Sequence, residues 1–275
     1  MSEAQARART TLVDCDRIEE ELRRVVATRD EVLAIVSHDL RNPLSAVQLS
    51  ARLLGELGLD ARARKHLEMI QRAVRSMSRL IDDLLDAVSI DSGKLALDLQ
   101  PVPVAAVMSE LRERHEVLAR DRGIELHVTC GAPGAAIVCD RARVLQVFGN
   151  LIANAAVSCR AGGAVTIACQ LAGDEVEFSV ADSGPGIDPG LIPHLFEPYW
   201  SSPPNIRRRV GLGLYIAKGI VERHGGRIRV KQSEMGGGDP GSAGGAGGKA
   251  PGGIDERPGA GPAIAFTLPR AAKAP

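Results

Sequence analysis

The chain contains few aromatic residues and no long hydrophobic run. Phe, Trp and Tyr together make up 3% of its 275 residues, so the core must be built from Leu, Val, Ile and Ala. No stretch approaches the roughly 18 continuous apolar residues that a membrane helix needs, and no apolar segment follows the basic residues near the N-terminus. We therefore expect neither a membrane-spanning helix nor a signal peptide in this chain.

Paired cysteines and an excess of one charge are also lacking. The five cysteines stand at positions 15, 130, 139, 159 and 169, and no two of them form a CxxC pair. This pattern argues against a disulfide framework and against a zinc site. Lys plus Arg equals Asp plus Glu at 34 each, which gives no support for a nucleic-acid or membrane-surface partner. Free thiols are typical of a reducing compartment, so we expect a cytoplasmic protein.

Two long amphipathic helices are predicted at the start of the chain. In the first, from about 10 to 57, apolar residues recur at helical spacing until Gly55 and Gly58 end the pattern. The second runs from about 61 to 90 and stops at Ser92-Gly93. Its apolar residues recur at alternating steps of three and four: Leu67, Ile70, Val74, Met77, Ile81, Leu84 and Val88. Such a hairpin buries its stripes best by dimerising into a four-helix bundle, the alternative being an intrachain coiled coil.

Strands and helices mix without strict alternation after residue 93, which predicts an α+β layer domain. The expected helices are 103–123, 141–159 and 210–226. The expected strands are 95–102, 124–130, 135–140, 164–173, 175–182, 227–232 and 263–269. Between the last two strands, Gly supplies 12 of the 27 residues of segment 236–262. That composition predicts a disordered insertion, because it offers too little apolar surface to offset the entropy of ordering.

A candidate nucleophile stands in the first helix, within the run SHDLRNPL. His38 lies two residues from both Val36 and Leu40 of the apolar stripe, about 200° around the helix, which predicts a side chain facing solvent. Asp39 could orient the imidazole or accept its proton, and Asn42, one turn further on, could position a water. An unprotonated imidazole is a nucleophile, whereas the ordinary alternative is a solvated surface histidine.

Three further motifs have the chemistry of a nucleotide site. Asn150 and Asn154 are four apart on one helix face, and amide oxygens suit Mg²⁺. Asp182 ends a strand before Gly184 and Gly186, where a carboxylate could accept a hydrogen bond from an amine such as that of adenine.

The third motif is the run Gly211, Leu212, Gly213 and Leu214, which opens a helix. Backbone N–H groups at a helix N-terminus bind phosphate, and glycine allows close approach. Taken singly, each of the three motifs has an ordinary alternative: two solvated amides, a common turn, or a simple helix start.

Together these motifs resemble those of a known family. EVLAIVSHDLRNPLSAV resembles the H-box of the dimerisation and phosphoacceptor domain of sensor histidine kinases. The three later motifs resemble, in order, the N, G1 and G2 boxes of GHKL ATPases, and HLFEPYW resembles the F-box of histidine kinases. The resemblance implies an α+β protein. An antiparallel helical hairpin forming a dimeric four-helix bundle would be followed by a GHKL (Bergerat) α/β sandwich that binds ATP.

The resemblance also implies a division of the chain and a reaction. Residues 1–27 would form a signalling helix, 28–93 the phosphoacceptor domain and 94–270 the ATP-binding domain. His38 would be autophosphorylated from Mg-ATP, with Asp39 as its acidic partner, and would pass the phosphoryl group to an aspartate of a response regulator. The position of Asn42 is the one that in this family supports dephosphorylation of the regulator.

Within the ATP-binding domain the resemblance assigns each motif a role. Asn154 would be the Mg²⁺ ligand, Asn150 would lie near the phosphates and Asp182 would bind adenine. The segment 189–210 would be the lid over ATP. The remaining nucleotide-binding positions implied are Gly184, Gly186, Gly211, Leu212, Gly213 and Leu214.

The sequence departs from the family pattern at two positions. Val157 stands where histidine kinases often carry a Lys, and Arg209 replaces the first glycine of the fuller G2 box. The hypothesis for compensation rests on Arg207, Arg208, Arg209 or Lys218. Two alternatives to a kinase follow: a nucleotide-binding phosphatase or scaffold that uses Asn42, and a mechanical GHKL ATPase, for whose transducer domain this length has no room.

Overall fold

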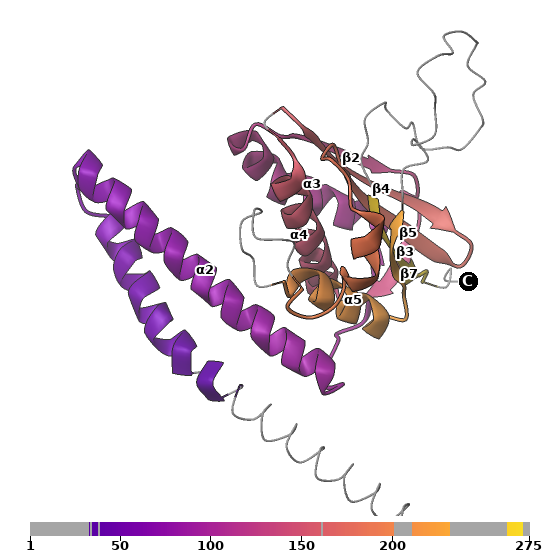
Figure 1. Cartoon of the computed structure of the whole chain (residues 1–275), viewed down its shortest axis with the longest axis horizontal. Helices are drawn as coiled ribbons and strands as arrows, with labels where there is room; N and C mark the ends of the chain where they lie inside the picture. The colour runs from indigo at the N-terminus through magenta and orange to yellow at the C-terminus, as the bar shows by residue number, and fades with distance from the viewer. Residues whose placement is uncertain are drawn as a thin grey trace, which may run out of the picture. The chain divides into compact units, whose positions relative to one another are not determined.

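The computed structural model describes residues 33, 35–37, 39–160, 162–200, 211–231 and 263–271. The chain divides into two compact units, Met1–Leu95 and Ala96–Pro275, which we describe one at a time (Figure 1). The predicted signalling helix over 1–27 and the glycine-rich insertion over 236–262 lie outside the described residues.

The first unit is a helical hairpin, as predicted. Residues 39–55 are helical, the chain reverses over 56–60, and α2 (Ala61–Asp91) returns alongside (Figure 1). The Asp60 carboxylate begins α2 by accepting a hydrogen bond from the backbone N–H of Ala63 at 2.7 Å. Gly93 has a φ of 68°, a left-handed conformation that glycine adopts readily just past a helix end.

Small residues allow the two helices of the hairpin to approach closely. Ala51 is 2% exposed, and its backbone carbonyl accepts a hydrogen bond from the Gln71 side chain at 3.2 Å. A side-chain carbon placed on Gly55 would lie 3.5 Å from Leu67 of α2. Nearer the phosphoacceptor motif, Arg41 forms an ion pair with Asp82 at 2.7 Å. The hairpin is therefore packed at its turn and tied by charge further along.

The apolar stripe of α2 divides into two columns. Leu67, Val74 and Ile81 are buried within the hairpin. Between them, Ile70 is 45% exposed and Met77 is 43% exposed. The first helix likewise leaves large apolar side chains about half exposed: Leu40, Val47 and Leu54. Half of the predicted stripe is thus unburied within one chain, as expected of a hairpin that packs against a second copy.

The second unit contains a five-stranded sheet in the order β2-β4-β5-β7-β6. Its strands are β2 (Glu125–Cys130), β4 (Ala164–Ala172), β5 (Glu175–Asp182), β6 (Ile228–Lys231) and β7 (Ala263–Pro269). The edge strand β2 pairs with β4 in parallel, and the other neighbours are antiparallel. A separate two-stranded sheet joins β1 (Gln100–Pro103) and β3 (Ala136–Cys139).

Three helices cover one face of the larger sheet: α3 (Val104–Asp121), α4 (Arg141–Ser158) and α5 (Gly213–Arg223) (Figure 1). At the centre of this layer, Phe148 of α4 packs edge-on against Phe178 of β5 and Phe266 of β7, with ring centroids 5.5 and 5.1 Å away. The expectation of a wholly aliphatic core is therefore corrected. Three of the four phenylalanines gather at one point, with aliphatic side chains around them.

Two elements begin three or more residues later than predicted. The strand expected over 95–102 begins only at Gln100, because its partner β3 offers four residues for pairing. The helix expected over 210–226 begins only at Gly213. Gly211 has a φ of 70°, which is outside the right-handed helical range, so the helix cannot include that residue. Part of the predicted lid forms a short 3₁₀ helix, η1 (Pro189–His194).

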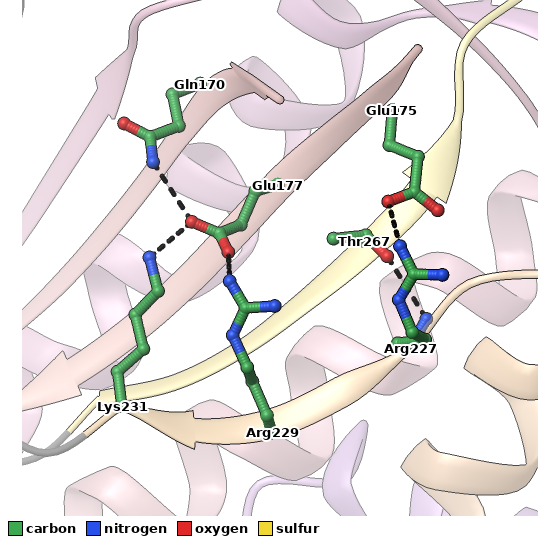
Figure 2. Close-up of polar contacts among 7 residues, drawn as sticks. All are labelled: Gln170, Glu175, Glu177, Arg227, Arg229, Lys231 and Thr267. Carbon is green, nitrogen blue, oxygen red and sulfur yellow. Dashed lines mark hydrogen bonds and ion pairs between the residues drawn. The ribbon is translucent and has the colours of Figure 1, made fainter. Parts of the chain in front are cut away.

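The opposite face of the sheet carries a charged cluster (Figure 2). Glu177 of β5 is 4% exposed and forms ion pairs with Arg229 and Lys231 of β6. Because β7 lies between β5 and β6, these long side chains reach across it, where its residues on this face are small: Ala263, Ala265 and Thr267. The cluster therefore joins two strands that do not hydrogen-bond to each other.

Candidate functional site

Helix α4 contacts both glycine motifs of the candidate nucleotide site. Asn150, Asn154 and Ser158 recur every four residues, so they share one face of the helix. A side-chain carbon on Gly213, at the start of α5, would lie 3.5 Å from Oδ1 of Asn150. One on Gly184, after β5, would lie 3.0 Å from the backbone oxygen of Ser158. Asn154 is therefore held between the two motifs.

Asp182 provides a fixed carboxylate at the end of β5. Its Oδ1 accepts a hydrogen bond from the backbone N–H of Gly184 at 2.8 Å. A side-chain carbon on Gly184 would lie 2.5 Å from that same oxygen, so only glycine fits this turn. Burial raises the pKa of the Asp182 carboxyl, and the hydrogen bond from Gly184 opposes that rise. The result is a half-buried acceptor suited to an amine donor.

The turn after Asp182 is anchored to the start of β4. Ser183 accepts a hydrogen bond through Oγ from the backbone N–H of Ala164 at 2.9 Å, and its own N–H donates to the Ala164 carbonyl at 3.0 Å. Sequence reasoning had singled out neither Ser183 nor Ser158. The four-residue spacing after Asn154 would have pointed to Ser158, whereas the pairing of Ser183 depends on strand register.

An unsatisfied donor lies at the other end of the site. Nδ2 of Asn150 is buried and has no hydrogen-bond partner among the residues that the structure describes. A buried amide N–H without an acceptor is costly, so a ligand oxygen there would be stabilising. At the adjoining start of α5, Leu212 supplies no side-chain cap, and the N-terminal turn of a helix favours an anion. This end of the site favours phosphate.

The residues of the site also suit magnesium better than a metal held wholly by protein. Within the described ranges no group of three or more His, Cys, Asp or Glu side chains could hold a metal ion. Mg²⁺ keeps several waters and phosphate oxygens and takes only one or two protein ligands. A single amide oxygen from Asn154, half-buried between the two glycine motifs, fits that requirement.

The described part of the predicted lid ends at Trp200, which lies against Gly211. The Cα of Gly211 approaches the backbone of Trp200 so closely that a side-chain carbon would overlap the Trp200 carbonyl. The backbone of Tyr199 beside it has a φ of 61°, an uncommon conformation for a bulky residue. Residues 201–210 lie outside the described part of the chain, and with them three of the arginines considered as replacements for the missing lysine.

The position of that missing lysine is visible in the structure. Val157 lies near the end of α4, one turn after Asn154, and is 39% exposed. The fourth candidate for compensation, Lys218, lies in the second turn of α5 and faces Glu222 at 3.8 Å. A longer basic side chain at position 157 would thus have room at the surface beside the site.

The phosphoacceptor motif is a part of the first unit and is only partly described. Asp39 and Asn42 are exposed on the first helix, and His38 between the described residues is not itself described. Ser37, at the start of the same run, is buried instead. In the described part of the chain, no helix is long and apolar enough to cross a membrane.

Two family models match this chain, one in each unit. Residues 139–272 match the histidine kinase-, DNA gyrase B- and HSP90-like ATPase family. This segment of the chain contains α4, the glycine turns and α5. The second unit is therefore an ATP-binding domain of the GHKL class. Residues 28–93 match the His Kinase A (phospho-acceptor) domain, a dimerising domain of two-component signalling.

Several known proteins are similar to most of this chain. The sensor protein DivL of Caulobacter vibrioides is 33% identical over 204 residues, covering 74% of this chain and 26% of DivL. The circadian input-output histidine kinase CikA of Synechococcus elongatus is 32% identical over 215 residues, 75% of this chain and 28% of CikA. The structure of full-length ShkA with AMPPNP has a TM-score of 0.67 at 27% identity, covering 89% of this chain and 47% of ShkA.

The chain therefore combines the two domains that characterise the sensor histidine kinases of two-component systems. It spans about a quarter of the length of the two curated relatives named above. The match covers both the helical hairpin and the ATP-binding sandwich, so the fold class predicted from the sequence is confirmed.

Proposed function

We propose that this chain transfers the γ-phosphoryl group of ATP to His38 and from there to an aspartate of a separate response regulator. The observation that carries the proposal is the position of α4, which contacts the start of α5 through Asn150 and the turn after Asp182 through Ser158. About 12 Å of helix separates those two contacts, at 1.5 Å per residue. A nucleoside triphosphate has an amine-bearing base at one end and phosphates at the other.

The residues of this chain would divide the binding of ATP between them. Asp182 accepts a hydrogen bond from the adenine amine, and Asn150 donates Nδ2 to a phosphate oxygen. The two turns around the nucleotide are narrow because they contain glycine: Gly184 and Gly186 after β5, and Gly211 and Gly213 at the start of α5. Leu212 and Leu214 alternate with the second pair. Asn154 holds Mg²⁺, which when bound neutralises charge on the phosphates. Phosphoryl transfer depends mostly on such positioning and charge neutralisation.

The chemical step makes one bond and breaks one. An imidazole nitrogen of His38 attacks the γ-phosphorus, the bond from that phosphorus to the bridging oxygen of ADP breaks, and ADP leaves with the electron pair. Asp39 is adjacent and takes up the imidazole proton or orients the ring. A carboxylate oxygen of the regulator then attacks the phosphorus and releases the imidazole. Asn42 positions water for the reverse, dephosphorylating activity.

The proposed assembly is a homodimer in the cytoplasm. The unburied apolar columns of the hairpin support a second copy of this chain as its partner. Four cysteines of the described residues are free thiols, which suits a reducing compartment that also contains ATP.

The experiment is incubation with γ-labelled ATP and Mg²⁺, comparing wild type with His38→Gln. We expect an acid-labile, alkali-stable label in the wild type and none in the variant, because a phosphohistidine has that stability. His66→Gln is the matched control, since His66 is an exposed histidine of the same hairpin and the variant should leave the label intact. If wild type binds ATP but takes up no label, the kinase proposal is wrong, and phosphatase or scaffold activity through Asn42 becomes the better explanation.

A further inference from the structure

Two thiols lie side by side at the edge of the five-stranded sheet, away from the proposed nucleotide site. Cys130 ends the edge strand β2, and Cys169 lies directly opposite it on β4. Their sulfur atoms are 3.3 Å apart, with the Cys169 thiol donating to the Cys130 sulfur. The two cysteines are 39 residues apart in the sequence, so only the parallel pairing of β2 with β4 brings them together.

The geometry of this pair is compatible with a disulfide. Neighbouring strands are spaced about 4.7–4.9 Å apart, and disulfides form between Cα atoms about 4.4–6.8 Å apart. Residues directly opposite each other on adjacent strands point to the same face, so both sulfurs lie on one side of the sheet. Side-chain rotation alone would bring the sulfurs from 3.3 Å to bonding distance.

The two thiols differ in access. Cys130 is half-buried, whereas Cys169 is only 3% exposed. Burial and the contact with Cys130 together raise the pKa of the Cys169 thiol to about 12, although the backbone N–H groups of Ala132 and Gly131 oppose the rise. Cys169 thus remains a protonated thiol at neutral pH, and Cys130 is the one that a small oxidant reaches first.

We propose that Cys130 and Cys169 form a peroxide-reactive dithiol site that closes to a disulfide between β2 and β4. The Cys130 sulfur attacks one peroxide oxygen, the O–O bond breaks, and water leaves with the thiol proton, giving a sulfenic acid. The Cys169 sulfur then attacks the Cys130 sulfur, the S–O bond breaks, and the hydroxyl leaves as water with the Cys169 proton. The two thiols are oxidised to one disulfide, and one peroxide is reduced to two waters.

The position of the proposed disulfide in the sheet determines which strands it would hold together. Asp182 pairs with Val165 near the start of β4, four residues before Cys169, so the cross-link closes beyond the proposed ATP-binding end of that strand. It joins the edge strand β2 covalently to the interior of the sheet. The other described cysteines have different neighbours: Cys139 is fully buried on β3, and Cys159 lies near Ser183. This inference does not depend on the proposed kinase reaction.

The test treats the full chain with hydrogen peroxide, unfolds it in denaturant so that buried thiols react, blocks free thiols with iodoacetamide and maps peptides without reduction. We expect a peptide pair joined through Cys130 and Cys169 that disappears when a reductant is added. The joined pair should be absent from Cys130→Ser, where Cys169 stays alkylatable, and present in the matched control Cys159→Ser. Oxidation of the wild type without that peptide pair, or with Cys169 still fully alkylated, would overturn the proposal.

A second variant keeps the test decisive if the serine substitution affects folding. In Cys169→Ala the resolving thiol is missing, so peroxide should leave a sulfenic acid at Cys130 that dimedone traps. Dimedone labelling of Cys159 or Cys139 instead would show that Cys130 is not the reactive thiol. In the oxidised wild type, amide exchange should slow in β2, and exchange that is unchanged or faster would rule out the cross-link as a brace of this edge.

Discussion

At the scale of single residues, the candidate site combines a carboxylate acceptor whose ionisation is unfavourable, Asp182, with an amide donor, Asn150, that has no hydrogen-bond partner among the described residues. Burial raises the pKa of Asp182, and Nδ2 of Asn150 is buried without an acceptor in the described structure. Both features are unfavourable for the empty domain, and both would be relieved by a ligand that carries an amine and an oxyanion. They are therefore better explained by binding than by folding.

Asp182→Asn should weaken nucleotide binding without weakening the fold. Hydrogen bonds to charged groups contribute about 1.5–3 kcal/mol, which corresponds to roughly 10- to 100-fold in affinity. Because the pKa of Asp182 is raised by folding, its ionisation costs folding free energy as the pH rises through that pKa. The variant should therefore unfold at the same temperature as the wild type or above it, as measured by thermal unfolding beside ATP-analogue titration.

The pH dependence of binding separates this role from a general effect. Wild-type affinity should fall on acidification, because the raised pKa allows Asp182 to lose its charge at a higher pH than an ordinary aspartate, and the variant should show a flatter profile. Asp174→Asn, an exposed position in the β4–β5 turn, is the matched control. Equal pH profiles for wild type and Asp182→Asn would contradict the assignment of Asp182 to the base.

Val157→Lys should strengthen the interaction with the phosphates. Val157 is exposed one turn after Asn154, so the substitution adds a cation beside the site without burying charge. A surface charge in this position is worth about 0.3–1 kcal/mol, or up to roughly fivefold in affinity for a triphosphate. The measurement is titration with an ATP analogue at two salt concentrations, and the gain should shrink at the higher one. A weaker affinity in the variant would count against the proposed place of the phosphates.

At the scale of secondary-structure elements, α4 organises the site and the charged cluster holds the far side of the sheet. The β6 and β7 strands are adjacent in the sheet although 31 residues separate Lys231 from Ala263. Glu177 helps to keep them in place from β5. Burial alone raises the pKa of the Glu177 carboxyl, but hydrogen bonds from Lys231 and Gln170 and the charges of Lys231 and Arg229 outweigh it and leave the pKa below its ordinary value (Figure 2).

Glu177→Gln should destabilise the ATP-binding domain by about 2 kcal/mol, less than the roughly 3–5 kcal/mol for breaking a fully buried ion pair, because the basic partners are partly exposed. The lowered pKa means that this stability is present above the unfolded pKa and is lost as the pH falls through the folded one. Denaturant unfolding should therefore separate wild type from variant at neutral pH and bring them together in acid.

The neighbouring pair offers a matched control for that experiment. Glu175 and Arg227 form an ion pair at 2.7 Å on the same sheet face, with the Arg227 side chain 70% exposed (Figure 2). Glu175→Gln should cost less than about 1 kcal/mol, as is usual for exposed pairs. If the two variants lose the same stability, burial of Glu177 is not the reason that its pair matters.

At the scale of the whole molecule, the hairpin is incomplete as a single copy. Ile70 and Met77 lie on the predicted stripe yet remain nearly half exposed, and the first helix presents Leu40 and Val47 in the same way. The family match to a phosphoacceptor domain implies dimerisation, and these columns are the apolar surface that a second hairpin would bury.

Met77→Glu should dissociate the dimer. Burying a methionine contributes about 1.5–3 kcal/mol, and a two-fold symmetric interface contains the position twice. Analytical ultracentrifugation should show a dissociation constant raised by at least about 100-fold. Met69→Glu is the control, because Met69 is 44% exposed but lies off the stripe. Dissociation by the control alone would place the interface on another face of α2.

Much of this architecture is predictable because it depends on local patterns. The alternating steps of three and four in α2, the stop at Gly93 and the order of the three nucleotide motifs are all properties of short windows, and the hairpin, the fold class and the family followed from them. The roles of the individual site residues stay predictions, including that of His38, which lies outside the described residues.

The tertiary structure alone decided what depends on pairing between distant segments. Because β7 lies between β5 and β6, Arg229 forms its ion pair with Glu177 across an intervening strand. The parallel register of β2 with β4 places Cys130 opposite Cys169. Likewise, the packing of α4 against both glycine turns left Asn150 with a buried, unpaired donor. Helical periodicity is written into neighbouring residues, whereas strand order and register are selected by burial of the whole sheet, which no short stretch of sequence encodes.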